Sequence, residues 1–166
     1  MRLARLGMKV VGVMVALWAV GQALARRRTA GDETSDEFEL AAYFGGGERR
    51  STATSLRRGI VRVCCGGVDL DLREASLDPL GATLDVSATW GGVNVVVPRT
   101  WKVWVDDRST LGGVDTRVTP PEELPDDAPE LRVSVNARMG GVAIKAADPV
   151  DPSAGSTHRV EGWAST

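Results

Sequence analysis

An apolar residue followed by two glycines recurs five times in this chain, and this repeat limits the possible folds more than any other feature. Valine follows the last four glycine pairs directly, at Val68, Val93, Val114 and Val142. A period of 20 to 50 residues is typical of repeat architectures in which each unit stacks on its neighbours. The five copies are Phe44-Gly45-Gly46, Cys65-Gly66-Gly67, Trp90-Gly91-Gly92, Leu111-Gly112-Gly113 and Met139-Gly140-Gly141.

The segments on both sides of the glycines alternate apolar and polar residues, which indicates β-strands. Leu84, Val86 and Ala88 alternate with polar residues and lead up to Trp90, and the residues before the other pairs follow the same pattern. An inward residue before the pair and an inward valine after it are three positions apart, so an unbroken strand would place them on opposite faces. Glycine accepts positive φ and close backbone approach, and we therefore expect the pairs to be corners.

A strand, a glycine corner and a second strand make a unit of the size of one coil of a β-solenoid. Stacked coils align the valines after the glycines into one internal ladder. We therefore predict an all-β domain over residues 38–146, built as a solenoid-like stack of about five coils. A β-sandwich of hairpins that turn at the glycine pairs is the alternative.

The N-terminal part of the chain predicts a membrane anchor over residues 1–28. Its apolar run, 6–25, is about as long as a bilayer-spanning helix and contains one charge, Lys9. Basic residues flank it on both sides (Arg2, Arg5, Arg26, Arg27 and Arg28).

Two alternatives to the anchor stay open. A secretory signal peptide fits the basic start and the Ala23-Leu24-Ala25 cleavage pattern, but three arginines after that site oppose export. A buried or interfacial helix is the other. The flanking charges are nearly balanced, and we place the C-terminal domain in the cytoplasm because of the compact arginine triplet and the unpaired thiols.

Three segments outside the strands read as polar connections. Residues 29–37 form an acidic linker, and residues 147–166 predict a disordered tail. The loop 119–129 combines four prolines with acidic side chains, and we expect it to be the most exposed excursion from the stack.

The composition excludes several classes of function. A net charge of −2 gives no basis for nucleic-acid binding. The single histidine, His158, leaves no room for histidine triads or multi-histidine metal sites. The glycine pairs lack the lysine of a phosphate-binding loop. We therefore predict no catalytic, cofactor-binding or metal site and no cofactor.

Acidic side chains offer one competing hypothesis. In a stack that follows sequence order, Glu48, Asp69, Asn94 and Asp115 hold equivalent positions just after the corners, and Asp71 and Asp85 lie on the same strands. Such a row would suit a hard cation such as Ca²⁺ or an enzyme built on it. We prefer solvent-facing strand residues, with Asp and Asn capping corner amides.

Strand alternation predicts which cysteines and tryptophans face the core. Cys65 is expected in the core and Cys64 outside it, with no disulfide between neighbours and no further ligands for a metal. Trp90 and Trp101 have core parity. Trp104 has outer parity, and we predict that it contributes to a partner surface.

The run Gly66-Gly67-Val68-Asp69-Leu70-Asp71-Leu72-Arg73-Glu74-Ala75 resembles the C-terminal domain of LiaF-like proteins, the cell wall-active antibiotics response proteins. The segments 44–50, 91–98 and 101–103 fit the same pattern. The resemblance, which covers 38–145, implies a non-enzymatic β domain attached to membrane helices, with a role in bacterial cell-envelope stress signalling. The best-known members restrain a sensor kinase, but they carry several membrane helices, whereas this chain has at most one.

Two functions follow as expectations. The first is a non-enzymatic, membrane-anchored interaction or regulatory protein whose protein partner the sequence does not name. The second is a structural scaffold module that self-associates through open ends of the stack.

Overall fold

The structure of the chain is a computed structural model, which describes residues 12–16, 18–21, 23 and 29–148. Within these residues the chain is helical at 12–16, 18–21 and 23 and then forms eight strands and one 3-10 turn. The two longest strands are β1 (Glu37–Arg50) and β2 (Arg58–Asp71). The others are β3 (Ala82–Thr89), β4 (Gly92–Pro98), β5 (Lys102–Asp107), β6 (Gly113–Arg117), β7 (Glu130–Ala137) and β8 (Gly141–Ala147), with the turn at Pro121–Glu123 between β6 and β7.

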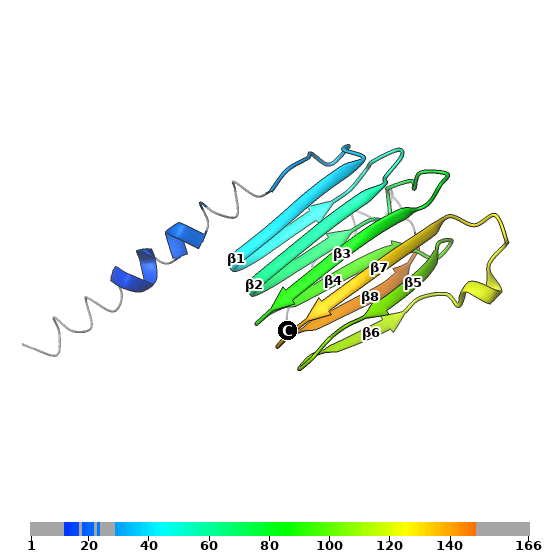
Figure 1. Cartoon of the computed structure of the whole chain (residues 1–166). Coiled ribbons are helices and arrows are strands. Elements are labelled where there is room, and N and C mark those ends of the chain that lie inside the picture. The colour runs from blue at the N-terminus through cyan, green and yellow to red at the C-terminus, as the bar shows by residue number, and fades with distance from the viewer. Residues whose placement is uncertain (1–11, 17, 22, 24–28, 149–166) are drawn as a thin grey trace, which may run out of the picture.

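Every named strand pairs with its neighbours in parallel, and together the strands form one nearly closed sheet (Figure 1). β1 and β2 each continue through a glycine corner, so each contributes one arm to each of two facing layers. The layer before the corners continues through β3, β7 and β5, and the layer after them through β4, β8 and β6. Parallel ladders rule out the sandwich of hairpins, since a hairpin pairs its strands antiparallel.

The coils do not stack in sequence order, and here the predicted solenoid is wrong. The fifth repeat, β7 and β8, lies between the third repeat and the fourth: Val142 on β8 pairs with Val93 on one side and with Val114 on the other. The loop 119–129 carries the chain back from β6 to the start of β7. The sheet therefore fits a sequential solenoid only in part.

The burial of the inward residues explains this order. Val142 and Ile144 of the fifth repeat are buried, because they lie between two coils. At the corresponding inward positions the fourth repeat has Asp107 beside Val135 and Thr116 beside Ile144, and both are exposed. A polar residue at an inward position destabilises the fold little at the end of a stack, where water reaches it, but strongly between two coils, where it is buried. The fourth repeat therefore forms the terminal coil.

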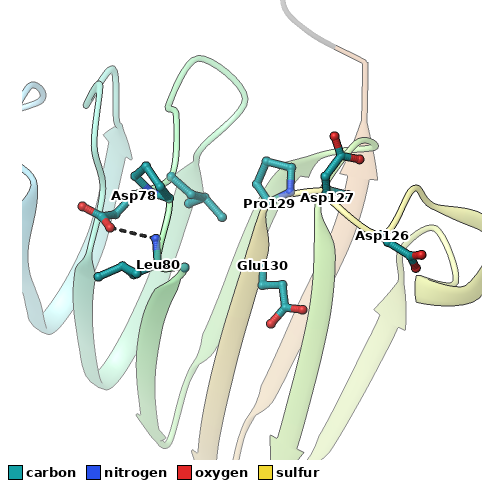
Figure 2. A pocket seen from close by; sticks show the side chains of 10 residues that line it. Asp78, Leu80, Asp126, Asp127, Pro129 and Glu130 are labelled. Atoms are coloured by element: carbon teal, nitrogen blue, oxygen red, sulfur yellow. Dashed lines mark hydrogen bonds between the residues drawn. The ribbon is translucent and has the colours of Figure 1, made fainter.

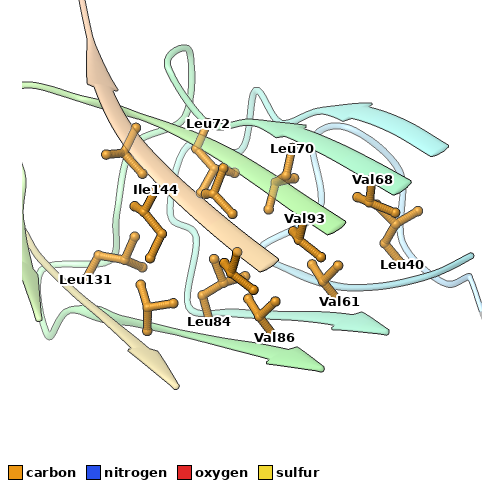
Figure 3. Packing of buried hydrophobic residues seen from close by; sticks show 14 of the residues in the cluster. Leu40, Val61, Val68, Leu70, Leu72, Leu84, Val86, Val93, Leu131 and Ile144 are labelled. Atoms are coloured by element: carbon orange, nitrogen blue, oxygen red, sulfur yellow. The ribbon is translucent and has the colours of Figure 1, made fainter. Parts of the chain in front are cut away.

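The core lies between the two layers, as Figure 3 shows. Val61 pairs with Leu40 and Val86 in one layer, while Leu70 pairs with Val95 in the other. Gly59 is needed in the first layer, because a Cβ there would lie 2.7 Å from both the Phe38 ring and the Leu84 side chain.

The first coil is closed by the acidic segment 29–37, which the sequence presented as a solvated linker. Arg49 takes the inward position beside Leu70, is 9% exposed, and has its guanidinium 4.6 Å from the centre of the Phe38 ring. It donates hydrogen bonds to the carbonyl oxygens of Gly31, at 3.2 Å, and Asp32. The segment therefore caps this end of the core.

No helix within the described residues has the length and apolar character that crossing a membrane requires. A spanning helix needs about 20 consecutive apolar residues. The prediction of a single-pass membrane anchor is therefore wrong. The predictions that rest on it, the membrane as a partner and a membrane localisation, are wrong as well. The basic flanks at 1–11 and 24–28 and residues 149–166 of the predicted tail, with His158, lie outside the described residues. Ala147, the first residue of the predicted tail, belongs to β8 instead and pairs with Pro98.

Candidate functional site

The backbone at the corners differs from the expectation that glycine would supply the positive φ. The residue before each of the first three glycine pairs takes it instead: φ is 53° at Phe44, 58° at Cys65 and 56° at Trp90. A left-handed conformation at a bulky residue costs roughly 1–2 kcal/mol. It also changes the direction of the side chain, which no longer follows the in-and-out alternation of the strand. Trp90 and Cys65, which parity assigned to the core, are consequently exposed.

The residues before all five glycine pairs are exposed and follow one another from coil to coil along the corner edge of the sheet, and we call this row the corner ridge. Trp90 is 63% exposed and Leu111 is 68% exposed. Neighbouring coils are about 4.8 Å apart, so a ridge of five coils is about 19 Å long. In spatial order it consists of Phe44, Cys65, Trp90, Met139 and Leu111.

The glycine after each ridge residue allows the coils to approach closely. A Cβ on Gly91 would lie much closer to the Gly66 carbonyl oxygen than van der Waals contact allows, and the same holds for a Cβ on Gly66 and the Gly45 carbonyl oxygen. Gly140 meets Gly91, and Gly112 meets Gly140, in the same way. The second glycines (Gly46, Gly67, Gly92, Gly113 and Gly141) have room for a Cβ, with no atom closer than 3.7 Å. The two glycines of each predicted corner therefore have different roles.

The N-terminal helical residues meet the ridge at its first end. Gly21 is buried, and a Cβ on it would lie 2.9 Å from Cδ2 of Phe44 and 3.0 Å from the Tyr43 carbonyl oxygen. Of the other helical residues, Val13, Met14, Val15, Trp18 and Val20 are more than half exposed. The contact thus covers one end of the ridge and leaves Trp90, Met139 and Leu111 open.

Both cysteines are free and lie at the ridge. Cys64 is half-buried, Cys65 is exposed, and their Sγ atoms are 3.7 Å apart. Burial raises the pKa of the Cys64 thiol, and the hydrogen bond and charge of Cys65 raise it further. The parity assignment of Cys65 to the core is therefore wrong, while Cys64 lies outside the core as expected.

Trp104 lies on the outer face of β5 and is 50% exposed. It borders a surface pocket of about 330 Å³ that also includes Thr83, Asp85 and Arg132. Trp101 is buried, 4% exposed. The partner surface assigned to Trp104 stays a prediction.

The acidic row after the corners is interrupted. Glu48, Asp69 and Asn94 are register neighbours, but Ala143 of the inserted repeat separates Asn94 from Asp115. Asn94 donates a hydrogen bond to Asp69 Oδ1 at 3.2 Å. Within the described residues, no three histidine, cysteine or acidic side chains are grouped to hold a metal ion.

The two remaining acidic candidates form ion pairs. Asp85 is 3.2 Å from Arg58. Asp71 accepts two hydrogen bonds from the Arg73 guanidinium, at 2.7 and 2.9 Å, and these lower the pKa of its carboxyl group. Both arrangements stabilise strand surfaces and provide no reactive group.

A pocket of about 400 Å³ lies between the β2–β3 loop and the end of the 119–129 loop (Figure 2). Asp78, Asp126, Asp127 and Glu130 give it an acidic lining. The Asp78 carboxylate accepts hydrogen bonds from Leu80 N at 2.9 Å and from Ser55 Oγ at 3.0 Å, and these lower the pKa of Asp78. The Asp126 carbonyl oxygen accepts from Lys102 Nζ at 3.1 Å, so these contacts hold the loops in place.

Comparison with known proteins found no matching family model, no similar curated protein and no similar solved structure. The resemblance to LiaF-like domains and the signalling role that it implies therefore gain no support from relatives.

The sequence contains one signal that indicates the ridge. The residue before the glycines varies from cysteine to tryptophan, whereas the residue after them is valine in four of five copies. A ladder packed inside a core demands uniform size, since each member touches the next, while an exposed row does not. The variable residues before the glycines therefore indicate an exposed row, and the uniform valines after them indicate a buried one.

Proposed function

We propose that this chain is a non-enzymatic interaction protein that docks an α-helix of a partner protein on its corner ridge. The observation that carries the proposal is the alignment of Phe44, Trp90, Met139 and Leu111 in one exposed apolar row. An exposed apolar surface of this kind typically marks a binding site in a soluble domain. The resemblance to LiaF-like domains adds the bacterial cell-envelope stress response as the setting.

A helix is the occupant that the chain's own contacts favour. Gly21, within the N-terminal helical residues, already packs on Phe44 with no room for a side chain. A ridge of about 19 Å matches the length of about 13 helical residues at 1.5 Å per residue. The partner should therefore present an apolar helical stripe with small residues at the closest contacts.

Site-specific photo-crosslinking in the cells that make the protein tests this proposal. A benzophenone side chain replaces Leu111 on the ridge or, as the control, Leu80, which is 97% exposed in the β2–β3 loop. We expect one discrete crosslinked protein from position 111, attached through an apolar helix, and none from position 80. Trp90→Ser should remove that product.

Two results would refute ridge docking. One is an absence of crosslinks from position 111. The other is the same set of products from positions 111 and 80, because exposure alone would then explain capture.

Self-association as a scaffold is the second candidate, and the terminal coil favours it. Val105 and Val114 on this coil are only partly buried, and no described residue covers β5 or β6 on the outer side. The other end of the stack is capped by Arg49 and residues 29–37. A molecule with one open end pairs with a second copy and does not grow into a fibre.

Sedimentation at rising protein concentration tests the second candidate. We expect a monomer–dimer equilibrium that Thr116→Arg, on the open end, shifts to monomer. Thr83→Arg, on the outer face in the middle of the stack, is the matched control and should leave it unchanged. A wild-type protein that stays monomeric at every concentration would eliminate the scaffold.

A further inference from the structure

The outer face of the layer before the corners carries an aromatic side chain beside a pocket. Trp104 lies on the edge strand β5, is 50% exposed, and lines the pocket of about 330 Å³ described above. Within the described part of the chain, no cation stacks on the Trp104 ring. The indole is therefore open to a flat ligand.

The parallel register places an arginine directly beside this tryptophan. Arg132 on β7 pairs with Trp104 on one side and with Thr83 on the other. Paired strands are about 4.8 Å apart, so one small ligand can contact all three side chains. Arg132 is exposed, and no carboxylate of the described residues forms an ion pair with it. Its guanidinium is thus available to an anion.

The two carboxylates that line the pocket are already neutralised. Asp85 lies 3.2 Å from Arg58, and Asp106 lies 2.8 Å from Arg108. Among the described residues that line the pocket, Arg132 therefore carries the one charge without a counter-ion. A ligand with a single negative charge complements this arrangement, whereas a doubly charged phosphate would be repelled by both carboxylates.

The same pocket offers partners for hydroxyl groups. The hydrogen bonds from Arg58 and Arg108 end on Oδ2 of Asp85 and of Asp106, which leaves Oδ1 of each to accept a hydrogen bond from a ligand. Thr83 and Ser134 add two hydroxyl groups, which both donate and accept. A ligand with several hydroxyl groups satisfies this mixed set, and a simple aromatic carboxylate does not.

We propose that this pocket binds an acidic sugar, a pyranose ring that carries one carboxylate. The carboxylate pairs with the Arg132 guanidinium, whose planar fork matches it. The C–H face of the ring packs on the Trp104 indole, and the ring hydroxyls bond to Thr83, Ser134 and the two aspartates. The volume is that of a small-molecule site. The pocket is separate from the corner ridge, so this inference does not depend on helix docking there.

Nuclear magnetic resonance of the ¹⁵N-labelled full chain tests the proposal through the indole N–H signals. We expect D-glucuronate to shift the Trp104 signal with a Kd on the order of 1 mM, while the signal of Trp90 stays in place. Two matched probes separate the contributions: D-glucose has the ring without the charge, and cyclohexanecarboxylate has the charge without hydroxyls. Each should bind at least about 10-fold more weakly than D-glucuronate.

Variants are compared by saturation transfer from the protein to the sugar, with circular dichroism and urea midpoints to verify folding. Trp104→Ser should abolish binding of both sugars, and Trp104→Phe should retain part of it. Arg132→Gln should lower the affinity for D-glucuronate at least about 10-fold, to that of D-glucose, and leave D-glucose unchanged. Arg138→Gln is the matched control, since Arg138 is an exposed arginine just after β7 and does not line the pocket. It should bind as wild type does.

Three results would overturn the acidic-sugar site. The first is a Trp104 signal that does not move at about ten times the expected Kd of D-glucuronate. The second is equal affinity of wild type and Arg132→Gln for D-glucuronate. The third is cyclohexanecarboxylate that binds as tightly as D-glucuronate, because the pocket would then recognise an apolar anion and no sugar.

Discussion

The α-carbon of Gly91 lies against the carbonyl oxygen of Gly66 so closely that no side chain fits between the two coils. The same contact recurs from coil to coil along the corner. It holds the strands on both sides of the corner in register, and it places the preceding residue on the surface. The ridge and the cysteine pair both depend on it.

Gly91→Ala should therefore destabilise the fold by about 3 kcal/mol or more, because the backbone oxygen that meets the new methyl group has nowhere to move. Gly92→Ala is the matched control. The nearest atom to a Cβ there is 3.7 Å away, and Gly92 has no positive φ. Its effect should be neutral or stabilising by up to about 1 kcal/mol. Urea denaturation measures both, and equal losses would contradict the different roles of the two glycines.

The two tryptophans that share core parity should respond in opposite ways. Trp101→Ala should cost about 3–5 kcal/mol, since this side chain is 4% exposed. Trp90→Ala should change the free energy of unfolding by less than about 1 kcal/mol, since its side chain is 63% exposed. Thermal and urea unfolding provide the comparison. A large decrease in the free energy of unfolding of Trp90→Ala would show that Trp90 is part of the core.

Trp90→Gly should stabilise the domain by about 1 kcal/mol while it abolishes partner docking. Glycine adopts the left-handed conformation without the penalty that tryptophan incurs at φ of 56°. Stability from urea unfolding and the crosslink at position 111 report the two effects separately. A stabilised variant that still docks its partner would separate Trp90 from the binding site.

Arg49→Ala should destabilise the first coil by about 2–3 kcal/mol, because two carbonyl oxygens lose a charged donor and the Phe38 ring loses its cover. Amide exchange should accelerate first in residues 30–36, which the guanidinium holds. Arg50→Ala is the control: Arg50 is exposed and forms surface ion pairs, at 3.8 Å with Asp71 and 3.6 Å with Glu74. Its cost should stay below about 1 kcal/mol.

The Asp71 carboxyl group should contribute stability only above its own pKa. Its hydrogen bonds from Arg73 lower the pKa in the folded state. The contribution is therefore present above the unfolded value, about 3.9, and disappears as the pH falls through the folded value. Asp71→Asn should cost about 1 kcal/mol at neutral pH and nothing in strong acid. In an Arg73→Gln background most of this pH dependence should vanish, and a difference that persists in acid would rule out the ion pair as its cause.

The strands and the glycine corners could be predicted from the sequence because each depends on residues that are close together in the chain. Leu84, Val86 and Ala88 alternate with polar residues, and the structure buries all three on β3. The direction of the side chain at each corner could not be predicted in this way. Parity assumes a continuous strand up to Trp90, and a single left-handed residue there reverses the assignment.

The sequence by itself determined which segments become strands, where each unit turns and which valines line the core, because alternation and glycine act over a few residues. Only the tertiary structure decided the order of the coils. Each repeat could pair with any other, and the order of the coils depends on which side chains become buried. Burial of Ile144 between two coils is favourable, whereas Thr116 and Asp107 remain exposed to water in the terminal coil. Tertiary packing also makes the acidic segment a cap on the core, because two of its carbonyl groups accept hydrogen bonds from the buried Arg49.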